Sequence, residues 1–174
     1  QGYINTKLVF DTININRANV QFGNQSDLIF NGSVAIADSK FSPLSWAKSK
    51  SSNIRLEIGN IQIERCVFDK LDVGVILNEK TNNCIISQSD FIQCYTGIQS
   101  SGSHLRVSNC MFKSNDVGAE IHGSSSADSF DNCYFFSSLN MGMYCETNDT
   151  INVPLSIISC GFYRNQTASQ SRNR

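Results

Sequence analysis

Apolar side chains along this chain alternate with polar ones in short segments that are separated by Gly, Asn, Ser and Asp. This period of two is typical of β-strands, and no segment shows the sustained period of 3.6 that an amphipathic helix requires. In the first part of the chain the pattern predicts short strands around 8–10, 13–15, 20–22 and 28–30. We therefore expect an all-β protein.

A repeat organises the rest of the chain. Each copy has a Cys or Ser two residues before a phenylalanine, and the phenylalanines are 23, 21, 23 and 27 residues apart. The five are Phe68, Phe91, Phe112, Phe135 and Phe162. A glycine follows four of them after six or seven residues, at Gly74, Gly97, Gly118 and Gly142. Three short strands in about 22 residues predict one coil of a parallel β-solenoid, with successive coils about 4.8 Å apart.

The repeat sets the expected domain organisation. Residues 1–165 are predicted to form one β-helix of six to seven coils, with residues 38–53 as a loop that protrudes from it. Residues 166–174 are polar and are predicted to be a frayed tail or a linker. Because the chain starts with Gln rather than Met, we expect it to be a piece of a longer protein.

The cysteines follow the repeat. Cys66, Cys110, Cys133 and Cys160 share one inward position, so we expect them to stack as small buried side chains. Stacked Cβ atoms about 4.8 Å apart exceed the mean disulfide separation of about 3.8 Å, which favours free thiols and folding in a reducing cytoplasm. A net charge of −1 argues against nucleic acid as a partner, and no apolar run is long enough to insert into a membrane.

The repeat has the form apolar-x-apolar-x-x-Cys/Ser-x-Phe followed by Gly-x-x-apolar. It resembles the right-handed, single-stranded parallel β-helix shared by pectate-lyase-like enzymes and bacteriophage tailspikes, over about residues 7 to 165. The resemblance implies a homotrimer in a virion tail that binds, and in many cases hydrolyses, bacterial surface polysaccharide. It implies no cofactor or metal, and the lack of Asp-rich calcium triplets disfavours the pectate lyase branch. The alternative is a non-catalytic spacer in a viral or cell-surface fibre.

One outward face carries candidate chemistry on the strand after each glycine. Glu120 and Glu146 fall on adjacent coils with an offset of two residues, which places them about 8 Å apart. Inverting glycosidases use two carboxyl groups about 6.5–9.5 Å apart, so these residues are the candidate catalytic pair. His122 is expected beside Glu146, Tyr144 beside Glu120 as a sugar platform, and Gln99 one coil earlier as a further substrate contact. The alternative is an ordinary solvated wall of polar residues.

A second outward face, on the Cys-x-Phe strand, is apolar towards the C-terminal end. Its large side chains are Met111, Tyr134, Phe136 and Tyr163. Such a patch is unfavourable in water, so it predicts the interface of a homotrimer. The alternative is that the 38–53 loop or another domain covers it. The third face, with Gln62 and Glu64, is expected to be solvated.

Overall fold

The computed structural model describes residues 7–23, 26–44, 52–102, 104–123, 128–147 and 155–173. All regular structure in these ranges is β-strand, arranged in three parallel sheets. Each coil contributes one strand to each sheet, so that every third strand of the chain pairs side by side. The all-β parallel solenoid predicted from the repeat is confirmed.

The three sheets are named A, B and C. Sheet A contains β1 (Lys7–Phe10), β4 (Asp27–Phe30), β7 (Asn53–Leu56), β10 (Val73–Leu77), β13 (Thr96–Ser101), β16 (Val117–His122), β19 (Met141–Thr147) and β22 (Thr167–Asn173). Sheet B contains β2 (Ile13–Asn16), β5 (Val34–Ala37), β8 (Gly59–Glu64), β11 (Thr81–Ser87), β14 (Leu105–Ser108), β17 (Ser129–Asp131) and β20 (Ser156–Ile158). Sheet C contains β3 (Asn19–Phe22), β6 (Lys40–Pro43), β9 (Val67–Asp69), β12 (Asp90–Ile92), β15 (Met111–Lys113), β18 (Tyr134–Phe136) and β21 (Gly161–Tyr163).

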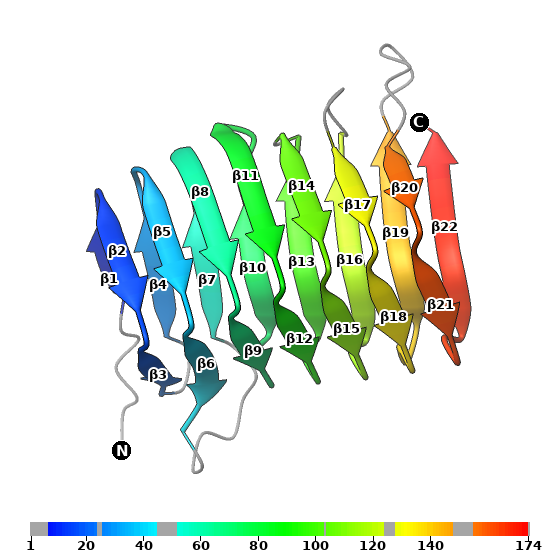
Figure 1. Ribbon diagram of the computed structural model, residues 1–174, viewed down its shortest axis with the longest axis horizontal. Helices are drawn as coiled ribbons and strands as arrows, with labels where there is room; N and C mark the ends of the chain where they lie inside the picture. Colours follow the sequence, from blue (N-terminus) through cyan, green and yellow to red (C-terminus); the bar gives the residue numbers. More distant parts are fainter. Residues whose placement is uncertain are drawn as a thin grey trace.

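The coils follow one another along the long axis of the molecule, from the blue N-terminal coil to the red C-terminal coil (Figure 1). The three sheets therefore run the length of the solenoid as three walls, and the N- and C-terminal ends of the chain lie at opposite ends. Residues in register on successive strands form columns along each wall. A column on the outside of a wall can thus bring together side chains that are more than 20 residues apart in the sequence.

A ladder of phenylalanine rings fills the interior behind sheet C. Successive rings are nearly parallel, with centroids 4.5–5.3 Å apart, from Phe41 through Phe68, Phe91, Phe112 and Phe135 to Phe162. The glycine column packs against this ladder. A Cβ atom on Gly74 would lie 2.8 Å from Cδ1 of Phe91 in the next coil, and one on Gly142 would lie 2.8 Å from Cδ1 of Phe162. The repeated glycine is therefore required because the phenylalanine of the following coil occupies the space of a side chain.

The cysteine column lies at the corner between sheets B and C. Cys66, Cys110 and Cys133 are buried, Ser39 and Ser89 take the same position in other coils, and all seven cysteines are free thiols. The residue before each of these positions turns the chain with a positive φ, for example 52° at Arg65 and 54° at Asn109. This left-handed residue gives the sharp corner, and Asn is among the residues that tolerate it best.

Two parts of the expected domain organisation need correction. The segment predicted as a protruding loop, 38–53, contains β6 and the first residue of β7, and Phe41 is fully buried in the ring ladder. Phe41 escaped the repeat because an insertion of extra residues follows it within its coil. Residues 166–174, predicted as a tail, contain β22, which pairs in parallel register with β19. Polar Thr, Ser and Gln side chains can extend a sheet when backbone hydrogen bonding and packing come from the preceding coil.

Candidate functional site

The candidate site lies on the outer face of sheet A. Parallel pairing places Gln99, Glu120, Tyr144 and Gln170 in one outward column and Ser101, His122 and Glu146 in the next. Tyr144 is beside Glu120 and His122 is beside Glu146, as the register of the sequence repeat predicts. Alternation along each strand turns these side chains outward, because Ile121 and Cys145 between them are buried.

His122 joins the two glutamates. Its Nε2 lies 2.8 Å from Oε1 of Glu120 on the same strand, and its Nδ1 lies 3.0 Å from Oε2 of Glu146 on the neighbouring strand. The three side chains are partly accessible, with exposed fractions of 27% for Glu120, 33% for His122 and 13% for Glu146. One imidazole thus connects a more exposed carboxylate to a more buried one.

This geometry fixes how protons are shared. Both ring nitrogens donate at once only in the imidazolium form, and a neutral imidazole donates from one nitrogen and accepts at the other. Both contacts are therefore hydrogen bonds only when the ring is charged or one glutamic acid is protonated. The cluster can hold a proton between two carboxyl groups, which is the chemistry that general acid–base catalysis requires.

The arrangement departs from the expected catalytic pair in one respect. The sequence places Glu120 and Glu146 on either side of an open space, whereas the structure places the imidazole of His122 in that space. An inverting glycosidase needs room for a water molecule between its carboxyl groups. Hydrolysis by this pair therefore requires the His122 ring to rotate away when substrate binds.

Tyr144 and Gln99 flank the cluster. The ring of Tyr144 is edge-on to that of His122, with centroids 5.9 Å apart, and both Tyr144 and Gln99 are half-buried. A tyrosine ring offers an apolar face on which a sugar can stack, and an amide can donate to and accept from hydroxyl groups. These two residues have the chemistry of a sugar-binding surface beside the glutamates.

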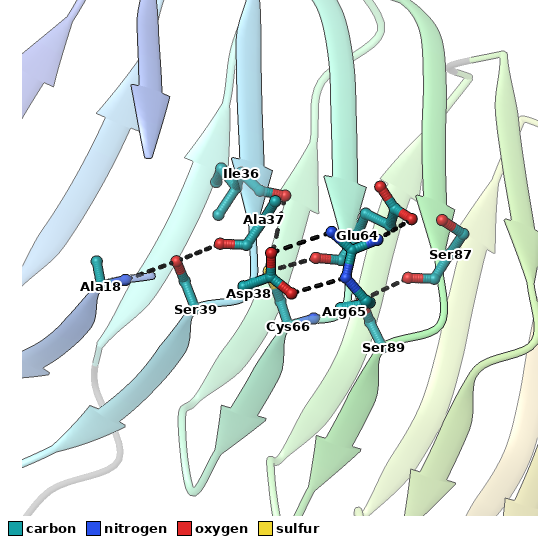
Figure 2. Close-up of polar contacts among 10 residues, drawn as sticks. All are labelled: Ala18, Ile36, Ala37, Asp38, Ser39, Glu64, Arg65, Cys66, Ser87 and Ser89. Atoms are coloured by element: carbon teal, nitrogen blue, oxygen red, sulfur yellow. Dashed lines mark hydrogen bonds and ion pairs between the residues drawn. The ribbon is translucent and has the colours of Figure 1, made fainter. Parts of the chain in front are cut away.

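A second polar cluster, which the sequence analysis missed, lies at the corner between sheets B and C. Figure 2 shows the guanidinium of Arg65 between Asp38 and Glu64. Nε and Nη2 of Arg65 donate to the two carboxylate oxygens of Asp38 at 2.7 and 3.0 Å, and the hydrogen bond from Arg65 lowers the pKa of Asp38. Asp38 and Arg65 occupy equivalent left-handed corner positions one coil apart, so the pair links successive coils.

The expected interface residues lie on the outer face of sheet C. Met111 and Tyr134 share one column, and Phe136 and Tyr163 share the next, with their rings stacked at 5.2 Å. Tyr134 and Tyr163 are each 55% exposed. Asp90 precedes Met111 in its column, and its partial burial raises the pKa of its carboxyl group.

The described residues include neither a metal-binding cluster nor a membrane-spanning helix. In this part of the chain no group of three or more His, Cys, Asp or Glu side chains has an arrangement that could hold a metal ion. None of the described segments forms a helix of the length and hydrophobicity needed to cross a membrane.

The fold and the sheet A site define a parallel β-solenoid of the class that commonly binds or acts on polysaccharides. A family model described as a right-handed β-helix region matches residues 6–158, and the chain belongs to this family. Comparisons with curated proteins and with solved structures gave no significant match.

Proposed function

We propose that this protein is a module of a bacteriophage tailspike, located in the virion tail, that binds bacterial surface polysaccharide on the outer face of sheet A and hydrolyses it. The observation that carries the proposal is the Glu120–His122–Glu146 cluster beside Tyr144. It combines two carboxyl groups, a proton-sharing imidazole and an aromatic platform on one partly accessible face.

The mechanism follows from the difference between the two glutamates. Glu120 is the more exposed and is the proposed proton donor to the glycosidic oxygen of the leaving sugar. Glu146 is the more buried and is the proposed base that activates water on the opposite side of the sugar ring. Sugar hydroxyl groups replace His122 as hydrogen-bond partners of the carboxylates, which opens the space for this water. Stereochemical inversion at the anomeric carbon is the expected outcome.

Depolymerisation of purified bacterial surface polysaccharide tests the catalytic proposal. Glu120→Gln and Glu146→Gln should each reduce the release of reducing ends by about 100-fold or more, since general acid–base groups contribute roughly 10²–10⁴ in rate. Ser101→Ala, on the same face but without a carboxyl group, is the matched control and should retain activity. Full activity in both glutamine variants would overturn the catalytic assignment.

A non-catalytic spacer is the second candidate function. The continuous ring ladder favours it, because stacked coils of this kind make a stiff rod regardless of what the outer face binds. The closed hydrogen bonding of His122 with both glutamates also fits an ordinary solvated wall. A wild-type protein that neither binds nor cleaves any surface polysaccharide of a panel would support the spacer.

The proposed assembly is a homotrimer whose sheet C faces meet at the axis, folded in the host cytoplasm without disulfides. Burial of each large apolar side chain on this face contributes roughly 1.5–3 kcal/mol, and four of them can offset an association cost of about 4–15 kcal/mol. Light scattering should give a trimer for the wild type and a smaller species for Tyr134→Ser/Phe136→Ser. Tyr95→Ser removes a tyrosine that is equally exposed but lies outside these two columns, and it should leave the trimer intact. Equal masses for the wild type and the double variant would contradict this interface.

A further inference from the structure

The outer face of sheet B is hollowed over its first four strands, β2, β5, β8 and β11. A groove with a volume of about 630 Å³ runs across them, within the range of about 300–1,000 Å³ typical of small-molecule sites. Its floor is at Ala35, whose short side chain lies between Asn14 and Gln62 in one outward column, with Ile85 next along. The sequence alone indicated only a solvated wall here.

The polar groups that line the groove are all uncharged. They are Thr12, Asn14, Ser33, Asn60, Gln62 and Asn83. Amides and hydroxyls both donate and accept hydrogen bonds, which matches the hydroxyl groups of a sugar. Ile85, 41% exposed, adds an apolar surface against which the C–H face of a sugar ring can pack. None of the residues that line the groove offers a charge to attract a phosphate, a nucleic acid or a uronate.

A backbone irregularity aims one of these amides at the groove. The register between β8 and β11 shifts between Asn82 and Cys84, so Asn83 is the extra residue of a β-bulge. Its φ is 47°, and it is the one described non-glycine residue with a positive φ inside a strand rather than next to a strand end. Bulges redirect side chains and are enriched beside binding sites. The bulge places Asn83 in the groove lining, while Asn82 continues the ladder.

The position of the groove excludes a peptide strand as its occupant. A peptide adds to a sheet through unpaired backbone groups at an edge. The groove lies on the face of sheet B, where β5, β8 and β11 each pair on both sides. Recognition here depends on side chains, and these are the side chains that suit a neutral, hydroxyl-rich ligand.

We infer that this groove is a second carbohydrate site, which binds a neutral saccharide of a few sugar units. It lies on a different wall from the Glu120–His122–Glu146 cluster, and it does not depend on that cluster being catalytic. A site of this kind on the first coils would hold a glycan while another part of it occupies sheet A.

Nuclear magnetic resonance of the ¹⁵N-labelled protein tests the inference. The probes are neutral oligosaccharides built of hexoses, deoxyhexoses or N-acetylhexosamines, with an oligogalacturonate as the charged comparison. At least one neutral probe should shift the side-chain amide signals of Gln62 and Asn83, and the oligogalacturonate should not. No shift with any neutral probe, or equal shifts with the charged one, would overturn the inference.

Variants locate the binding and separate it from the proposed catalytic site. Ala35→Phe fills the floor and should weaken binding at least tenfold, while Ser129→Phe, in the same outward column beyond the groove, should not. Asn83→Gly keeps a residue that tolerates the positive φ but removes the amide, and a lost hydrogen bond should weaken binding about fivefold. Glu120→Gln should leave these shifts unchanged. Binding that survives Ala35→Phe or disappears in Glu120→Gln would overturn the site.

Discussion

Gly74 lies where the backbone of one coil meets the phenylalanine of the next, so Gly74→Ala is expected to destabilise the solenoid strongly. The added Cβ would lie 2.5 Å from the carbonyl oxygen of Gly97 and 2.8 Å from Cδ1 of Phe91. Ordinary contacts of a Cβ atom begin at 3.4 Å. The carbonyl oxygen belongs to the backbone of β13, which is held between β10 and β16, so it cannot retreat without disturbing the parallel ladder.

The magnitude follows from these contacts. Overpacking of a core costs about 1–3 kcal/mol, and displacement of a paired strand adds about 1 kcal/mol for a weakened hydrogen bond. We expect a loss of about 3 kcal/mol in the free energy of unfolding. For a chain of this length that corresponds to a decrease of roughly 6–12 °C in Tm. Urea and thermal unfolding followed by circular dichroism measure both quantities.

Gly123→Ala is the matched control. A Cβ on Gly123 would meet no atom within 4 Å, and the cost is limited to its positive φ of 63°, about 1–2 kcal/mol. A Gly74→Ala protein as stable as Gly123→Ala, or more stable, would refute the interlocking of glycine and phenylalanine between coils.

Three further predictions concern titratable groups. Burial raises the pKa of Asp90, so its charged form disfavours folding and Asp90→Asn should raise Tm at neutral pH but not below the pKa of an unfolded Asp; an unchanged or lower Tm at neutral pH would contradict this. The hydrogen bond from Arg65 lowers the pKa of Asp38, so the pair stabilises the fold above the unfolded pKa of Asp and this contribution is lost as pH falls through the folded value. Arg65→Gln should reduce acid sensitivity in pH-dependent melts, and an identical acid transition would exclude this role. Burial raises the pKa of the Cys84 thiol, and the contact with Cys110 followed by burial raises that of Cys133, so native protein should react with iodoacetamide far more slowly than urea-unfolded protein; equal rates would show that the interior is open.

The regular part of the fold could be predicted because each coil repeats the same demand on its side chains. Phe91 and Phe112 fill the same interior slot, and the glycine between them, Gly97, is excluded from carrying a side chain by the next ring. Spacing along the chain therefore reports packing across coils. Phe41 obeys the same rule but was missed, because an insertion within its coil broke the spacing to its neighbour.

The candidate site could be predicted only as far as strand register reaches. Register placed His122 beside Glu146, but not the turn of its Nε2 towards Glu120, which depends on the ring orientation. The pairing of Arg65 with Asp38 was missed because it joins two corner residues that carry no strand pattern. The groove on sheet B depends on the bulge at Asn83 and on the size of Ala35, and neither has a sequence signature of its own.

The position of a bound oligosaccharide on the solenoid tests the central claim most directly. A crystal structure of Glu146→Gln with a fragment of the bacterial surface polysaccharide measures it. We expect sugar rings over β13, β16 and β19, with one ring stacked on Tyr144, a glycosidic oxygen within hydrogen-bond distance of Glu120, and His122 rotated out of the space between the two side chains. Sugar bound only on sheet B or sheet C, with the sheet A face bare and His122 unmoved, would contradict the account.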